Sequence, residues 1–438
     1  MKSITRAVIC SVALVFIFPV TSLADKQYEQ LKKKIDLLEK QLKEVRKILK
    51  KQVAKVKKVD KKISAPRSKF RPANQQVITR REARQLEQKV NAISGWKKSN
   101  TKIHMAGYAD VGYSDKVNST GSFTVGTFSP IFHFQYKDLV MLEAEIEFEL
   151  GANGETETSL DYMTIDWFVS DYAAVVVGKF LSPIGQFRQN LHPSWINKLP
   201  SAPPGFGHDG AAPVSDTGLQ LRGGFPIGRF RTNYAIYTGN GPELTTEWNG
   251  ADFELDGINA EGKGADRDGE KVLGGRFAIL PFKRFEIGVS FLSGKATVTT
   301  IEDEAGTAPS LSNEQARDYK VYGFDLAWKV KSFGFRSEYV KSTVGNTLSG
   351  VSASAGGTWK TWYTQMSYRI PGTKYEIINR YTNFQTPLPA QDQKQWAIGF
   401  NYLLANNFVA KIAFESNDGQ TGAVTDDDRW LIQIAYGF

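Results

Sequence analysis

From residue 102 to residue 438, hydrophobic and polar residues alternate in short segments that turn residues separate. A period of two is typical of β-strands, because successive side chains point to opposite sides of an extended chain. The alternation predicts sixteen strands, at about residues 102–113, 122–136, 139–150, 158–170, 172–181, 216–225, 228–239, 271–280, 285–295, 319–330, 333–342, 359–370, 374–384, 395–404, 407–416 and 429–438.

The last ten residues show this alternation most clearly. One face carries apolar side chains only, those of Trp430, Ile432, Ile434, Tyr436 and Phe438, whereas the other face is mixed. About ten residues with an aromatic residue at each end suit a tilted strand that crosses a bilayer. A strand of a soluble sandwich could alternate in the same way, so this segment favours a membrane barrel without deciding the question.

The connections between the predicted strands alternate between short and long. The short ones are 137–138, 170–171, 226–227, 281–284, 331–332, 371–373 and 405–406, and the long ones are 114–121, 151–157, 182–215, 240–270, 296–318, 343–358, 385–394 and 417–428. Bacterial outer-membrane barrels have short periplasmic turns, longer outer loops and an even number of strands. The pattern therefore predicts an all-β transmembrane barrel of about sixteen antiparallel strands over residues 101–438, with a water-filled lumen.

The N-terminus has the features of a secretory signal peptide, which we place at residues 1–24. Lys2 and Arg6 precede an apolar run from Ala7 to Phe18, and small residues follow before Asp25. The chain's one cysteine, Cys10, lies in this run. Disulfides, thiolate metal sites and haem attachment are therefore excluded for the exported chain.

Residues 25–65 predict an α-helical coiled-coil stalk in the periplasm. Their apolar residues follow a heptad spacing: Tyr28, Leu31, Ile35, Leu38, Leu42, Val45, Leu49, Val56, Val59 and Ile63. Pro66 ends the helix, and residues 66–100 predict a linker and a second short helix from Thr79. The stalk either only oligomerises the protein or also contacts an anionic neighbour, such as the cell-wall polymer or lipid headgroups. Its core residues do not decide between two and three helices.

The net charge of +9 combines two opposed regions. Residues 25–100 hold 24 Lys+Arg against 8 Asp+Glu, a net charge of +16, and residues 101–438 hold 29 against 38, a net charge of −9; the signal peptide adds +2. A basic chain suggests nucleic acid as a partner. Export argues against that partner, and we predict none.

The predicted lumen face carries charges of both signs. Alternation turns four glutamates of one strand inward, Glu143, Glu145, Glu147 and Glu149, and places arginines on later strands inward: Arg222, Arg231, Arg276, Arg336, Arg369 and Arg380. Charged rows of this kind set the ion preference of pores. Equally, the two sets could neutralise each other as a structural network, and the sequence leaves both interpretations open.

The third long connection, residues 182–215, contains six prolines. We expect this loop to fold inward as a constriction, since a loop of this length in a compact domain is usually functional; an external lid is the alternative. The candidate constriction residues are Arg188, His192, Trp195, Lys198 and Asp216. His192 and the pair His208–Asp209 are too sparse to suggest a metal site, so we predict hydrogen bonding for them and neither metal nor cofactor. No enzymatic motif is present.

Two stretches resemble a known group of proteins. Val177-Gly-Lys-Phe-Leu-Ser-Pro-Ile-Gly-Gln-Phe187 with the Pro-rich loop after it, and the terminal Ala435-Tyr-Gly-Phe438, resemble exported porins with an N-terminal coiled coil, close to the phosphate-selective porin O and P family. The resemblance implies a homotrimer in outer-membrane lipid and passive diffusion through its pores. Phosphate selectivity in that family depends on a basic lumen, and the acidic charge of residues 101–438 argues against carrying it over.

The sequence therefore predicts a non-enzymatic outer-membrane porin that passes small hydrophilic or anionic solutes. Two other functions stay open. The barrel could be a sleeve around a partner, such as an electron-carrying protein, or the stalk could tether the outer membrane to the cell wall.

Overall fold

The computed structural model describes residues 100–117, 120–208, 210–303 and 306–438. The predicted signal peptide (1–24), coiled coil (25–65) and linker with its short helix (66–100) lie outside the described residues, apart from residue 100. None of the helices in the described part has the length and apolarity that a membrane span needs.

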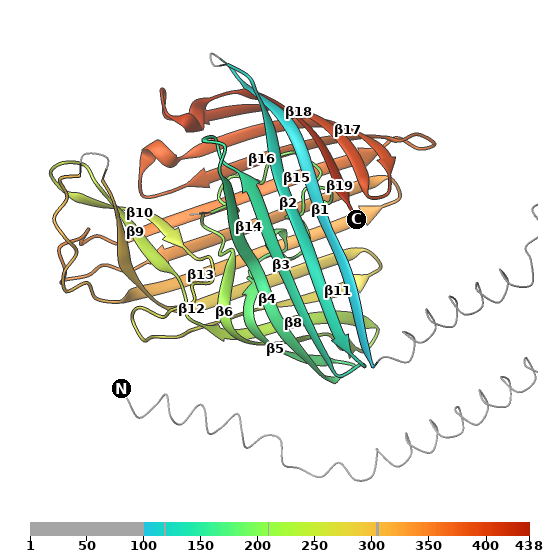
Figure 1. The fold of residues 1–438 in the computed structure, drawn as a ribbon, viewed down its shortest axis with the longest axis horizontal. Coiled ribbons are helices and arrows are strands. Elements are labelled where there is room, and N and C mark those ends of the chain that lie inside the picture. Colours follow the sequence, from blue (N-terminus) through green and yellow to red (C-terminus); the bar gives the residue numbers. More distant parts are fainter. Residues whose placement is uncertain (1–99, 118–119, 209, 304–305) are drawn as a thin grey trace, which may run out of the picture. The chain divides into compact units, whose positions relative to one another are not determined.

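The described residues form one continuous sheet of nineteen strands (Figure 1). Three of them, β7, β9 and β10, lie outside the closed ring, which leaves sixteen. The ring consists of β1 (Thr101–Lys116), β2 (Ser122–Tyr136), β3 (Val140–Leu150), β4 (Thr156–Ser170), β5 (Ala173–Leu181), β6 (Ser215–Gly223), β8 (Phe230–Gly239), β11 (Val272–Phe282), β12 (Phe285–Glu302), β13 (Arg317–Val330), β14 (Phe333–Val344), β15 (Gly357–Arg369), β16 (Tyr375–Gln385), β17 (Gln393–Ala405), β18 (Phe408–Gly419) and β19 (Arg429–Gly437).

Each strand of the ring pairs antiparallel with the next, and β19 pairs antiparallel with β1. At the seam, Phe438 and Gly107 exchange backbone hydrogen bonds of 2.9 and 3.1 Å, and the C-terminus lies beside β1 (Figure 1). Closure leaves the ring without unpaired strand edges. The predicted closed barrel of about sixteen strands is confirmed.

The alternation in the sequence separates the outside of the barrel from its interior. Along β17, Trp396, Ile398 and Phe400 are 54, 58 and 43 % exposed, whereas the intervening Gln395 and Ala397 are 1 and 0 % exposed. The same separation holds along β19, where Trp430, Ile432, Ile434, Tyr436 and Phe438 are all exposed. The outer surface is therefore apolar, and the polar residues of these strands face the lumen.

The prediction for residues 240–270, a connection without strands, was wrong. This segment contains a hairpin of β9 (Glu243–Trp248) and β10 (Phe253–Asn259), and β9 also pairs in parallel with the outer end of β12. The hairpin forms because Leu244, Leu255 and Ile258 become buried, together with Val298 of β12. For the same reason β12 continues to Glu302 instead of ending near residue 295.

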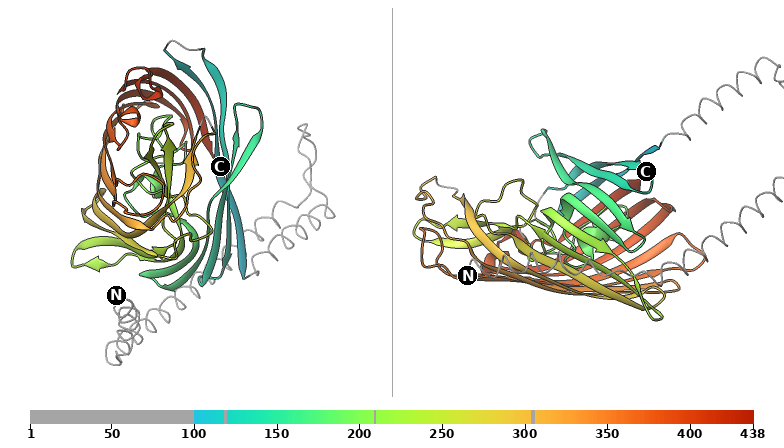
Figure 2. Two further views of the ribbon diagram at one scale, coloured as in Figure 1. Left: turned by 90° about the vertical axis from the view of Figure 1, so that its left-hand side faces the viewer. Right: turned by 90° about the horizontal axis from the view of Figure 1, so that it is seen from below.

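Short elements complete the connections. The two-residue strand β7 (Pro226–Ile227) pairs with β8 in a tight turn. The 3₁₀ helices η1 (Pro389–Gln391) and η2 (Val424–Asp426) lie in two of the longer loops. The connection from β5 to β6, residues 182–214, contains the short helix α4 (Phe187–Asn190) and runs inside the ring of strands (green in Figure 2, left).

Candidate functional site

The stretch Val177–Phe187 directs the chain from β5 into the barrel. Phe180, Ile184 and Phe187 are only 3, 2 and 4 % exposed, so apolar burial holds the entry of the loop. Gly178 has φ +130°, and a Cβ on it would lie 2.1 Å from the carbonyl oxygen of Met163 on β4. Gly185, with φ +74°, makes the following turn, and its N–H donates to Ser290 Oγ at 3.1 Å.

Glu338 of β14 is the first anchor of the inward loop. Its carboxylate is 2 % exposed and accepts hydrogen bonds from the backbone N–H groups of Gln186, at 2.8 Å, and Phe187, at 3.2 Å. The hydroxyl of Tyr363 donates to its other oxygen at 2.6 Å. Hydrogen bonds between a carboxylate and backbone N–H groups are stronger than neutral ones. The start of the loop is thereby fixed to β14 and β15.

The side chain of Gln186 also connects the loop to charged side chains of β13 and β14. Its Nε2 donates to Asp325 at 2.8 Å, and Arg336 donates to its Oε1 at 3.1 Å. Asp325 is itself fully buried and accepts two hydrogen bonds from Arg276, at 2.8 and 2.6 Å. A buried carboxylate needs such partners, so Asp325 joins the loop to the arginines of the wall.

The middle of the loop contacts strands β16, β17 and β19. Lys198 forms an ion pair with Glu376 of β16, and its carbonyl oxygen accepts a hydrogen bond from Asn401 of β17 at 2.8 Å. Burial lowers the pKa of the Lys198 ammonium, and Glu376 opposes that shift. Trp195 lies against Gly437 of β19, where a Cβ would be 2.6 Å from the ring.

Further hydrogen bonds follow along the same segment. Arg380 of β16 is fully buried and donates to the carbonyl oxygen of Ser201 at 3.0 Å. Thr361 of β15 donates to Pro204, and Ser342 of β14 donates to Ala211, at 2.7 and 2.6 Å. With contacts from β12 to β19, the loop crosses the lumen instead of covering it from outside.

The glutamates predicted to face inward lie on the opposite wall. Glu143 accepts a hydrogen bond from Tyr162 at 3.0 Å, Glu145 from Tyr108 at 2.7 Å and Glu147 from Ser129 at 3.4 Å. Glu149 differs from these three, because it is exposed at the outer end of β3 and is registered opposite Glu157.

Sequence alternation missed a further carboxylate of this wall, that of Asp161. In the pairing of β3 with β4, Glu145 is opposite Tyr162 and Ile146 is opposite Leu160, so Asp161 is the extra residue of a β-bulge. A bulge re-aims a side chain that strict alternation would place on the other face. Asp161 therefore joins the glutamates on the lumen side, close to Glu145 and His192.

Two of the predicted loop residues, Arg188 and His192, face this acidic wall. Burial lowers the pKa of the Arg188 guanidinium, and the carboxylates of Asp161, Glu261 and Glu147 oppose that shift. His192 Nε2 lies 3.8 Å from Glu145 Oε1, and its Nδ1 contacts the carbonyl oxygen of Arg188. The loop thus reaches both walls of the barrel.

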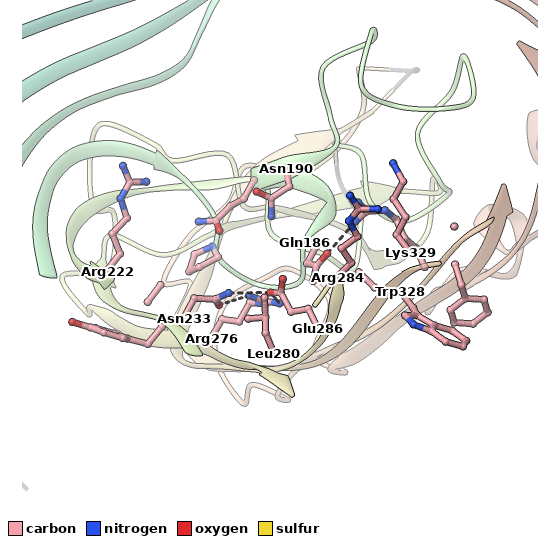
Figure 3. Close-up of a pocket in the computed structure, with 18 of the residues that line it drawn as sticks. Gln186, Asn190, Arg222, Asn233, Arg276, Leu280, Arg284, Glu286, Trp328 and Lys329 are labelled. Carbon is pink, nitrogen blue, oxygen red and sulfur yellow. Dashed lines mark hydrogen bonds and ion pairs between the residues drawn. The ribbon is translucent and has the colours of Figure 1, made fainter. Parts of the chain in front are cut away.

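A cavity of about 1120 Å³ lies between the loop and the short turns, and basic side chains outnumber acidic ones in its lining (Figure 3). Figure 3 shows Arg276 between Asn233 and Glu286, to which it donates at 2.9 and 2.8 Å. Arg222 lines the same cavity and forms an ion pair with Asp166. Arg336 and Arg369 also line it.

Three predicted site residues lie elsewhere. Asp216 belongs to strand β6 and not to the loop; it is 4 % exposed and accepts hydrogen bonds from the N–H groups of Thr217 and Gly241, at 2.8 and 3.2 Å. Arg231 is exposed near a turn, paired with Pro226 and Leu280, and does not line the cavity. Arg380 is fully buried under the loop, so its role there is to hold the loop.

No family model and no curated protein matches the chain. Solved structures do match it. An anion-selective porin from Comamonas acidovorans superimposes with a TM-score of 0.51 and 13 % identity, covering 77 % of this chain and all of that one. The fold is a porin-type barrel. A trimer form of OmpT, an outer membrane protein of Vibrio cholerae, gives a TM-score of 0.51 and 10 % identity over 77 % of this chain and 99 % of that one. At such identities the likeness is one of fold alone.

Proposed function

We propose that this protein is an outer-membrane channel through which small hydrophilic solutes diffuse passively, with a preference for anions. The observation that carries the proposal is the basic cavity below the inward loop. Its lining contains eight Lys and Arg residues, namely Lys198, Arg222, Arg276, Arg284, Lys329, Lys331, Arg336 and Arg369. It contains three acidic residues, Asp171, Glu286 and Glu376.

Local partners neutralise only part of this positive charge. Arg222, Arg276 and Lys198 form ion pairs with carboxylates. Among the described residues, the other five form no ion pair, and Arg336 donates only to the neutral Gln186. A passage with low-dielectric walls and one sign of charge concentrates counter-ions. Anions are therefore expected to be enriched in this part of the lumen.

The apolar outer surface of the barrel supports the proposal that it lies in a membrane. An apolar band around a closed sheet suits lipid, because closure satisfies every strand edge internally. The alternation of tight turns and long loops favours the outer membrane, with the short turns on the periplasmic side. We further propose a homotrimer, in line with the predicted coiled coil. OmpT of Vibrio cholerae, whose fold is similar, has a trimer form.

From the resemblance to the phosphate-selective porin O and P family, we keep the binding of small anions in the lumen but not strong anion selectivity. The basic cavity offers a place for a small anion, whereas the carboxylates on β3 and β4 oppose strong anion selectivity on the other side of the lumen. Weakly selective diffusion of small organic anions is compatible with both the basic cavity and the carboxylates on β3 and β4. The role as a sleeve is disfavoured, because the segment 182–214 occupies the interior that a partner protein would need. The proposed cell-wall contact would depend on the stalk.

Planar-bilayer recordings test the proposal directly. Purified protein is expected to give discrete single-channel steps, and the reversal potential in a KCl gradient is expected to have the sign of anion preference. The absence of steps would contradict the channel, and a reversal potential of the opposite sign would contradict the role of the basic cavity.

A matched pair of charge reversals tests the cavity residues. Lys331 and Lys137 both occupy left-handed turn positions, with φ 51° and 52°, but only Lys331 lines the cavity. Lys331→Glu is expected to shift the reversal potential toward cations, because it places a negative charge in the lining of the cavity. Lys137→Glu is expected to leave it close to the wild-type value. Equal shifts for both variants would show that the preference does not arise in the cavity.

A further inference from the structure

Three side chains with metal-ligating atoms converge on the acidic wall. They are Glu145 from β3, Asp161 from the bulge of β4 and His192 from the inward loop. One ligand atom of each lies within 4.8 Å of the other two. The three come from separate parts of the sequence, which is why the sequence spacing predicted no metal site.

The hydrogen bond of His192 fixes which nitrogen is free to bind an ion. Its Nδ1 contacts the carbonyl oxygen of Arg188. A carbonyl oxygen only accepts, so Nδ1 carries the proton, and in the neutral imidazole Nε2 presents its lone pair. Nε2 is buried and has no hydrogen-bond partner among the described residues. At 3.8 Å, the oxygen of Glu145 is too distant to be one.

Glu145 presents a second buried acceptor without a partner. Its side chain is 1 % exposed, and Oε1 accepts the hydrogen bond from Tyr108 at 2.7 Å. Its Oε2 is buried without any hydrogen-bond partner in the described part of the chain. A buried carboxylate is costly unless a cation or hydrogen-bond donors compensate its charge. Two buried acceptors from different elements, neither with a hydrogen-bond partner among the described residues, therefore lie close together.

The neighbouring basic side chains do not supply that cation. Arg188 and Lys179 are close enough to interact electrostatically with Asp161. Among the described residues, however, neither forms an ion pair with Glu145 or Asp161, and Arg188 Nε is itself without a partner. Both cations thus lie beside the cluster and not within it.

We propose that Glu145, Asp161 and His192 bind a divalent transition-metal ion, with Zn²⁺ as the best-suited ion. Imidazole nitrogen and carboxylate oxygens are usual Zn²⁺ ligands, and two carboxylates with a neutral imidazole balance its charge. Tetrahedral ligand atoms about 2.0–2.2 Å from one Zn²⁺ ion lie about 3.3–3.6 Å apart. From the 4.8 Å limit of the cluster, the ligand atoms therefore need to approach one another by at most about 1.5 Å, a distance that side-chain rotation can cover. The ion would join the inward loop to β3 and β4, on the side opposite Glu338.

Isothermal titration of the full-length detergent-solubilised protein with Zn²⁺ tests the site. The wild type is expected to bind one Zn²⁺ per chain, and His192→Ala and Asp161→Asn are each expected to weaken binding at least about tenfold. Mg²⁺ is expected not to compete, because it prefers an octahedron of oxygen ligands. X-ray absorption at the zinc edge is expected to show mixed nitrogen and oxygen ligands.

His208→Ala is the matched control. His208 lies in the same loop and also pairs with a carboxylate, that of Glu261, but it is 69 % exposed and outside the cluster. Its replacement is expected to leave Zn²⁺ affinity unchanged. Should His192→Ala fail to fold, Glu145→Gln removes the charge with little change of shape and is expected to weaken binding as well. Wild-type affinity in the folded variants, or competition by Mg²⁺ at equal strength, would overturn the proposal.

Discussion

Replacement of Glu338 by alanine is expected to release the inward loop and to increase single-channel conductance. The carboxylate accepts hydrogen bonds from the N–H groups of Gln186 and Phe187 and from Tyr363. Each buried donor left without an acceptor costs about 1–3 kcal/mol. The entry of the loop then has little reason to stay against β14, and a displaced loop leaves a wider lumen. Planar-bilayer recording measures the conductance, and limited proteolysis of the loop measures its release.

Two further variants separate the anchor from the charge. Glu338→Gln keeps an oxygen that accepts from backbone N–H groups, so its conductance is expected to lie between those of the wild type and the alanine variant. Glu286→Ala also removes a negative charge from the interior of the barrel, but Glu286 contacts Arg276 and Asn233 and not the loop. It is expected to leave loop proteolysis unchanged. If Glu338→Ala conducts like the wild type, the segment 182–214 does not set the width of the pore.

The barrel could be predicted from sequence because its strongest signals are local. Alternation along each strand fixes which side chains face outward, and the sorting of short and long connections fixes the order of the strands around the ring. Trp396, Ile398 and Phe400 lie outward for this reason. The hairpin of β9 and β10 was not predicted, because its apolar residues become buried against the extended end of β12, a contact distant in sequence.

The interior was less predictable, because one irregularity changes the face of a residue. The bulge in β4 turns Asp161 toward the lumen, although the next residue, Tyr162, also faces the lumen. Partners also decide what a charge can do. Arg276 and Arg336 have the same position in the alternation, yet Arg276 is bound by Asp325 and Glu286 while Arg336 contacts only Gln186. Those partners lie on other strands or in the loop, and only the folded barrel brings them together.

Gly178 is the residue of the Val177–Phe187 stretch whose replacement is expected to affect folding most. A Cβ at this position would lie 2.1 Å from Met163 O, and φ +130° is a conformation that other residues rarely adopt. Backbone strain costs about 1–3 kcal/mol and overpacking about 1–3 kcal/mol more. Gly178→Ala is therefore expected to lower the free energy of unfolding by about 2–6 kcal/mol. Urea titration of the protein folded into lipid vesicles measures this loss.

The control for this prediction is Gly154→Ala in the loop between β3 and β4. Gly154 has φ +84°, but no atom lies within 4 Å of the position of a Cβ. It therefore carries the backbone strain without the steric contact, and its expected loss is only about 1–3 kcal/mol. A loss for Gly178→Ala no larger than that for Gly154→Ala would show that β4 moves away at little cost. A larger loss would mean that the close approach of β4 and β5 requires glycine in β5, shortly before the chain leaves the wall for the lumen.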